Sequence, residues 1–83
     1  MKARVEEVTS RDFGERVYTG TLEMNRRFRA QAIPPFDYVY VWVTCDNRRD
    51  QTERNATPGE KHAVVRALLQ YELQQTIAER RPM

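Results

Sequence analysis

The stretch that decides the fold is residues 36–45, FDYVYVWVTC, because it alternates strictly between two kinds of side chain. Successive side chains of a β-strand point to opposite faces of the sheet. The first face consists of Tyr38, Tyr40, Trp42 and Thr44. The second face consists of Val39, Val41, Val43 and Cys45. Since neither face is charged, the pattern predicts a central strand with both faces at least partly covered.

Three weaker strand patterns precede this segment. They run from Lys2 to Thr9, from Glu15 to Met24 and from Phe28 to Ile33. The intervening residues 12–15, with Gly14, and the polar residues 25–27 are typical of turns. Gly20, in the middle of the second pattern, indicates a bulge or a close contact with another backbone. The third strand ends at Pro34, which has no N–H to donate to a neighbouring strand.

Residues 57–60, TPGE, predict the start of a long helix after a polar, charged loop at 46–56. Thr57 is a capping residue, Pro58 suits the first helical position, and Glu60 completes a capping box. We expect the helix to end near Arg80. The chain is therefore predicted to form a single α+β domain over residues 1–83. Its four-stranded, mainly antiparallel sheet precedes one long C-terminal helix packed on one face.

The predicted helix carries more apolar surface than one packing face requires. At 100° per residue, one stripe consists of Val64, Ala67, Leu68, Tyr71 and Ala78. A second stripe consists of Val65, Leu69, Leu73 and Ile77. The valine face of the sheet accounts for one stripe. The other is covered either by a broad sheet that curls around the helix or by another chain. We expect a homodimer, formed through this second stripe or through the aromatic face of the sheet.

Composition and charge narrow the class of protein. The 83 residues are 40% hydrophobic and 31% charged, which is typical of a folded domain. No apolar run approaches the ~20 residues of a membrane-spanning helix, and the first residues lack the apolar core of a signal peptide. We therefore expect a cytoplasmic location. A single cysteine excludes an internal disulfide, and a lone histidine argues against a structural zinc site.

No motif predicts catalysis, a metal site or a cofactor. Cys45 and His62 could form a nucleophile–base pair, but no Gly-rich elbow surrounds Cys45. Its position on the valine face is typical of a buried cysteine that behaves as a small apolar residue. Asp46, Asp50 and Glu53 share a loop with three arginines, which would repel a cation. The sequence therefore predicts a non-enzymatic protein without a cofactor.

The residues enriched at binding hot spots, tyrosine, tryptophan and arginine, are concentrated in two segments. The predicted protein contacts are Tyr38, Tyr40, Trp42, Arg26, Arg27 and Arg29, from the fourth strand and the turn before the third. Tyr18 is a further candidate for the aromatic face. This pattern predicts a small regulatory or inhibitory protein that occupies a surface of a host protein. Such proteins are common among the accessory proteins of phages and mobile elements.

Nucleic-acid binding is the alternative function. An aromatic sheet face is suited to stacking bases, and arginines in the adjacent turn are suited to phosphates. However, the net charge is only +2, and the acidic residues Glu23, Asp37 and Asp46 lie near the same surface. The sequence patterns of common nucleic-acid-binding modules are absent. These observations favour a protein partner.

Overall fold

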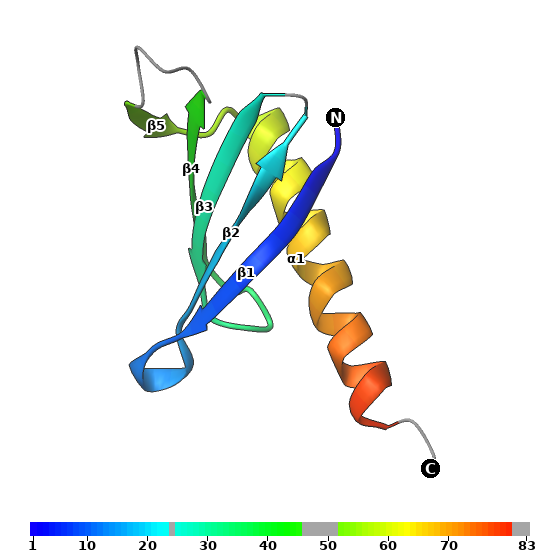
Figure 1. The fold of residues 1–83 in the computed structure, drawn as a ribbon. Helices are drawn as coiled ribbons and strands as arrows, with labels where there is room; N and C mark the ends of the chain where they lie inside the picture. The colour runs from blue at the N-terminus through cyan, green and yellow to red at the C-terminus, as the bar shows by residue number, and fades with distance from the viewer. Residues whose placement is uncertain (24, 46–51, 81–83) are drawn as a thin grey trace.

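The computed structural model describes residues 1–23, 25–45 and 52–80. Its strands are β1 (Ala3–Ser10), β2 (Arg16–Leu22), β3 (Arg26–Ala32), β4 (Val39–Cys45) and β5 (Glu53–Asn55). A short 3-10 turn (Asp12–Gly14) joins β1 to β2, and the helix α1 (Pro58–Glu79) follows β5. The strands form one antiparallel sheet in chain order, and α1 crosses one of its faces (Figure 1). The predicted α+β fold is confirmed, with five strands in place of four.

Two boundaries differ from the prediction. The predicted loop at 46–56 contains β5, whose three side chains are all exposed and therefore show no apolar alternation. Residues 46–51 of that loop, and Met24 at the predicted end of the second strand, lie outside the described residues. The predicted turn at 25–27 is shorter, because Arg26 and Arg27 already pair with β2.

The hydrophobic core lies between α1 and one face of the sheet. It consists of Tyr18, Leu22, Phe28, Ala30, Ala32, Val39, Val41, Val43, Ala63, Val64 and Leu68. The alternation predicted for β4 is confirmed, since its three valines are buried whereas Tyr40 is exposed. Burial of these apolar side chains contributes roughly 25 cal/mol per Å² of surface removed from water. The valine face is thus the surface on which the helix packs.

Two side chains differ from expectation. Tyr18 does not join the aromatic face, because it pairs with Ala30 in the row of core residues and is fully buried beneath α1. Its hydroxyl donates a hydrogen bond to Glu72 Oε1 at 2.7 Å, and burial together with this bond raises the pKa of Tyr18. Cys45 is not buried: it is the last residue of β4 and is exposed.

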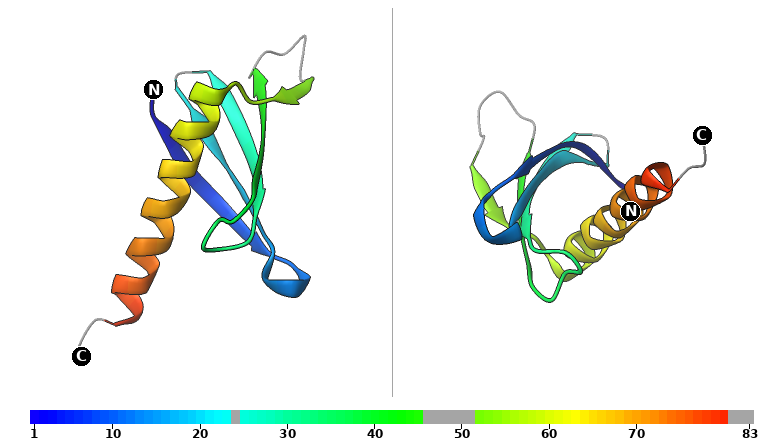
Figure 2. Two further views of the ribbon diagram at one scale, coloured as in Figure 1. Left: turned by 180° about the vertical axis from the view of Figure 1, so that it is seen from behind. Right: turned by 90° about the horizontal axis from the view of Figure 1, so that it is seen from below.

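The helix is longer than the sheet that it covers. Its 22 residues span about 33 Å, whereas a seven-residue strand spans about 23 Å. Figure 2 shows the C-terminal turns of α1 extending beyond the sheet. Every residue from Leu73 to Arg80 is exposed, including Ala78, which was predicted to pack with the first stripe. The sheet therefore accounts for the burial of α1 only as far as Glu72.

A buried carboxylate holds the first turn of α1 against the sheet. Glu60 is 1% exposed and accepts hydrogen bonds from Arg26 in β3 at 2.7 Å and from Arg54 in β5 at 2.7 and 3.0 Å. Both bonds of the predicted capping box, between Thr57 and Glu60, are present. The arginine and backbone hydrogen bonds outweigh desolvation and lower the pKa of Glu60 to about 2.

The low pKa of Glu60 predicts a specific acid sensitivity. A carboxylate whose pKa is lower in the folded state stabilises the fold above its unfolded pKa of about 4.5, and this contribution is lost as the pH falls toward 2. We expect Glu60→Gln to lower the free energy of unfolding by about 3 kcal/mol at pH 7, and by much less at pH 2.5. Urea unfolding at both pH values measures the difference.

Glu6→Gln is the matched control, because it removes a carboxylate whose ion pair is exposed. We expect it to cost less than about 1 kcal/mol. An equal loss for the two variants at pH 7 would contradict the assigned role of Glu60.

The absence of a side chain at Gly20 permits a close approach of two strands. The register of β1 shifts between Val5 and Glu7, opposite Gly20, which confirms the predicted bulge. A Cβ atom at Gly20 would lie 1.9 Å from the carbonyl oxygen of Arg4 and 2.8 Å from a ring carbon of Phe28. Backbone and core side chain would both have to move to admit it.

We therefore expect Gly20→Ala to destabilise the fold by about 3 kcal/mol, mainly through overpacking at the Arg4 carbonyl. Gly59→Ala is the control, because a Cβ atom at this helical position meets no atom within 4 Å. That variant should be neutral or more stable by about 0.5 kcal/mol. Thermal unfolding of both variants measures the contrast, and similar melting temperatures would contradict the assignment.

Candidate protein interface

The sheet face opposite α1 carries aromatic and charged side chains, and we call it the open face. Its residues are Thr19, Arg27, Arg29, Tyr40, Trp42 and Glu53, with Tyr38 directly before β4. These side chains meet because the register places them in two rows across the sheet. One row joins Thr19, Arg29, Trp42 and Asn55, and the next joins Thr21, Arg27, Thr44 and Glu53. The single helix lies on the other face (Figures 1 and 2).

Three aromatic rings form a continuous stripe along the open face. The ring centroids of Tyr38 and Tyr40 are 5.3 Å apart, and those of Tyr40 and Trp42 are 6.2 Å apart. Tyr40 is 58% exposed and Tyr38 37% exposed, whereas Trp42 is half-buried. An exposed ring on a central strand costs little conformational entropy to immobilise, because the strand already fixes its backbone.

Arg29 holds Trp42 in place. Its guanidinium carbon lies 4.0 Å from the ring centroid of Trp42, a cation–π arrangement. The same guanidinium donates two hydrogen bonds to Glu53, at 3.0 and 2.9 Å. These bonds raise the pKa of Arg29 and lower that of Glu53. Trp42 is therefore presented in one fixed orientation, with one side of its ring covered.

Two further polar side chains of the open face have partners. Arg27 donates to Glu6 at 2.8 Å, across the sheet from β3 to β1. The hydroxyl of Tyr38 donates to Glu15 at 3.2 Å. Partial burial and this hydrogen bond raise the pKa of Tyr38. Arg27 and Arg29 are thus each neutralised by a carboxylate from a strand two positions away in the sheet.

The structure separates Arg26 from the other predicted contact residues. Alternate residues of β3 point to opposite faces, so Arg27 and Arg29 lie on the open face whereas Arg26 lies on the helix side. There it donates to the buried Glu60. The grouping of the three arginines in one exposed turn was wrong because these residues belong to a strand. The missed signal is that Arg26 is one residue from Arg27 and three from Arg29, which places its side chain on the opposite face of a strand.

The second apolar stripe of α1 forms a separate exposed surface. Leu69 is 50% exposed, and Leu73 and Ile77 are each 60% exposed. Val65 is half-buried and packs at the border of the core. The curl of the sheet therefore does not cover this stripe. The three exposed side chains lie four residues apart, so they form one ridge along the helix.

No group of three or more histidine, cysteine or acidic residues within 1–23, 25–45 and 52–80 could hold a metal ion. No described helix is long and apolar enough to cross a membrane.

A comparison of the chain with known protein families, curated proteins and solved structures finds no match. The geometry of the surface is therefore the basis for a functional proposal.

Proposed function

We propose that this chain is a non-enzymatic, cytoplasmic binding module that regulates or inhibits a host protein by occupying its surface. The observation that supports this best is the aromatic stripe of the open face. Tyr40 is largely exposed in the middle of a central strand, and Arg29 holds the neighbouring Trp42 in a fixed orientation. Preorganised tyrosine and tryptophan side chains are typical of binding hot spots.

The ion pairs of the open face favour a protein partner over a nucleic acid. A nucleic-acid surface needs cations that are free to contact phosphates. Here Arg27 and Arg29 contact Glu6 and Glu53, and the guanidinium of Arg29 covers one side of the Trp42 ring. A surface of paired charges around aromatic anchors instead resembles the polar rim and core of a protein interface.

The contribution of the open face is tested with Tyr40→Thr, which removes the exposed ring and keeps a residue that favours strands. We expect it to weaken capture of the partner from host lysate by tenfold or more, a loss of about 1.4 kcal/mol or more in binding. Trp42→Ala should weaken binding further, by about 2 kcal/mol, while the protein remains folded. Mass spectrometry of the captured proteins identifies the partner, and a titration with the purified partner then gives the affinity.

Phe13→Ala is the control, because Phe13 is an aromatic residue that is 96% exposed in the β1–β2 turn, outside the open face. Equal capture by wild type and Tyr40→Thr would refute the open face as the binding surface. Unfolding of Trp42→Ala would show that Trp42 is part of the fold and not a contact residue.

Nucleic-acid binding through the same aromatic stripe remains the second proposal. It predicts that single-stranded oligonucleotides bind and that their affinity falls steeply as salt is added. Binding that depends on Tyr40 and shows a steep salt slope would replace a protein with a nucleic acid as the partner.

We further propose that two copies of the chain associate through the ridge of Leu69, Leu73 and Ile77. The reason is that three large apolar side chains on one helix lose exposure to water when they pack against an equivalent ridge. We expect a sedimentation mass of about twice the 9.9 kDa of the chain. We expect the Leu73→Glu variant to be a monomer, whereas the Gln74→Glu variant, changed one position away, should remain a dimer. A wild-type monomer at high concentration would contradict this proposal.

A further inference from the structure

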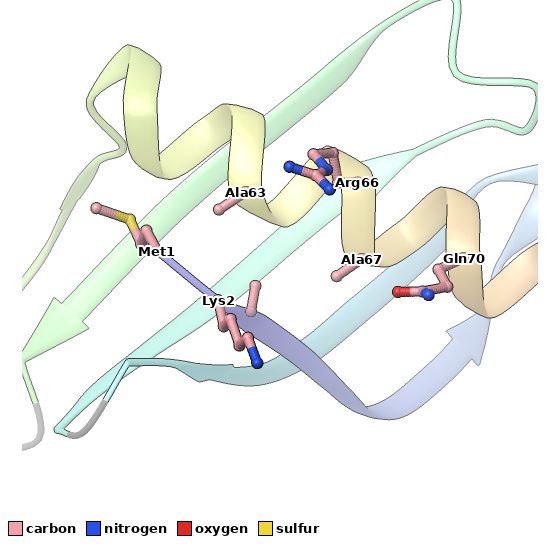
Figure 3. Close-up of a pocket in the computed structure, with 7 residues that line it drawn as sticks. Met1, Lys2, Ala63, Arg66, Ala67 and Gln70 are labelled. Carbon is pink, nitrogen blue, oxygen red and sulfur yellow. The ribbon is translucent and has the colours of Figure 1, made fainter.

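The outer edge of β1 and the adjacent face of α1 border a groove that none of the proposals above uses. Figure 3 shows its widest part, a cavity of about 540 Å³ between the start of β1 and the helix. Ala63 and Ala67 line the helix side, with Arg66 and Gln70 beside them. The groove continues along β1 as far as Val5 and along α1 as far as Gln74. Small side chains on the helix leave room for an extended segment of chain beside β1.

The edge of β1 offers backbone hydrogen bonds to such a segment. β1 is the first strand in the order of the sheet, so no strand of the described residues lies along its outer side. The carbonyl of Lys2 accepts a hydrogen bond from the N–H of Glu23, toward β2. Because the bonding direction alternates along an antiparallel strand, Ala3 and Val5 direct their N–H and C=O groups toward the free edge. These groups border the same groove.

The charges along the groove distinguish this part of the surface. In the described chain, Arg16, Arg26, Arg27, Arg29 and Arg54 each contact a carboxylate. By contrast, the side chains of Lys2, Arg4 and Arg66 have no ion-pair partner among the described residues, and all three residues border the groove. Arg4 pairs with Thr21 of the open face, so Lys2 and Arg4 extend on the open-face side of the β1 edge, whereas Arg66 lies on the helix side. The other described cations without an ion-pair partner, Arg11, Lys61 and Arg80, do not line this groove. No acidic residue lines this part. Further along α1, Glu72 and Glu79 line the next cavity, so the positive potential is confined to the Ala3–Val5 section.

We propose that this groove binds an extended, acidic peptide segment of a partner protein, which adds a strand to the Ala3–Val5 edge of β1. The backbone groups of Ala3 and Val5 supply the pairing. Lys2 and Arg4 recognise carboxylates on the open-face side of the added strand, and Arg66 recognises those on its helix side. The segment lies on the sheet edge beside α1, whereas the open face lies opposite α1. The proposal therefore does not depend on the binding function assigned to the open face.

A second copy of the chain fits this edge less well. Continuous pairing of β1 with another β1 would have to cross the bulge between Val5 and Glu7, which shifts the register there. The bulge thus limits pairing to the short section that precedes it. That section carries two of the three unpaired cations that border the groove, so two copies would place like charges side by side.

The test uses a fluorescein-labelled, capped hexapeptide, Val-Glu-Glu-Val-Glu-Glu, whose glutamates reach both sides of an added strand. It is titrated with the protein and followed by fluorescence anisotropy. The matched probes are the same peptide with lysine in place of glutamate, and the glutamate peptide with N-methyl groups on the amides of one edge. We expect the glutamate peptide to bind at least about tenfold more tightly than either probe. The lysine peptide carries positive charges in place of the carboxylates, and the methylated peptide lacks the backbone N–H donors of one edge.

Variants of the protein separate the two sources of recognition. Arg66→Glu should weaken binding of the glutamate peptide about tenfold, whereas Lys61→Glu, the same charge change on α1 outside the groove, should leave it within about twofold. Ala3→Pro should also weaken binding, because proline lacks the N–H at the free edge and is tolerated there. Tyr40→Thr should bind the peptide as the wild type does, so failure of the open-face proposal would leave this result unchanged.

Backbone amide signals in NMR spectra locate the bound peptide. We expect shifts at Ala3, Val5 and Ala67, and slower hydrogen exchange of the Ala3 and Val5 amides. Equal binding of the methylated peptide would overturn the proposal in favour of a general anion surface. Shifts confined to Tyr40 and Trp42 would overturn it as well. Protection of the same two amides without peptide, in a dimer that Arg66→Glu does not alter, would show that a second copy covers this edge.

Discussion

The Glu60 carboxylate is the interaction on which the arrangement of helix and sheet depends. It caps α1 through Thr57 and accepts hydrogen bonds from arginines of two different strands. A buried carboxylate without these partners would cost several kcal/mol, so its burial requires β3, β5 and the first turn of α1 to be in place together. The short β5 has no apolar side chain to hold it. Its attachment relies on backbone pairing with β4 and on the ion pairs of Glu53 and Arg54.

This fixed start determines which surfaces are left uncovered. Because α1 begins at the edge of β5 and crosses toward β1, its C-terminal turns pass beyond the sheet (Figure 1). The apolar ridge with Leu69, Leu73 and Ile77 has no partner within the described chain. The same crossing leaves the groove beside β1, where small helix residues face a strand edge. Both surfaces therefore follow from a helix that is about 10 Å longer than the strands beneath it.

Much of this fold could be predicted from two local signals. The alternation of residues 36–45 assigned β4 and its two faces, and residues 57–60 placed the helix start at the observed residues. Gly20 indicated the bulge because a strand interior gains nothing from glycine unless another backbone comes close. By contrast, β5 is three exposed polar residues, and nothing in its sequence distinguishes it from a loop. Its position depends on ion pairs with residues that are distant along the chain.

The candidate site shows where sequence reasoning stops. The exposure of the β4 aromatic residues follows from the alternation with valines. The faces to which the side chains of Arg26 and Tyr18 point depend on where their strands begin and end, and the polar residues there gave no clear boundary. The pairing of arginines with carboxylates from other strands was also beyond a single sequence, because it depends on register. These ion pairs change how the high arginine content of the chain is interpreted. Most of the described arginines hold strands together or orient Trp42, so the arginine content alone says little about partners. Among the described cations without such a task, Lys2, Arg4 and Arg66 border one groove. They are more informative, because a charge without an internal partner remains available to an external one.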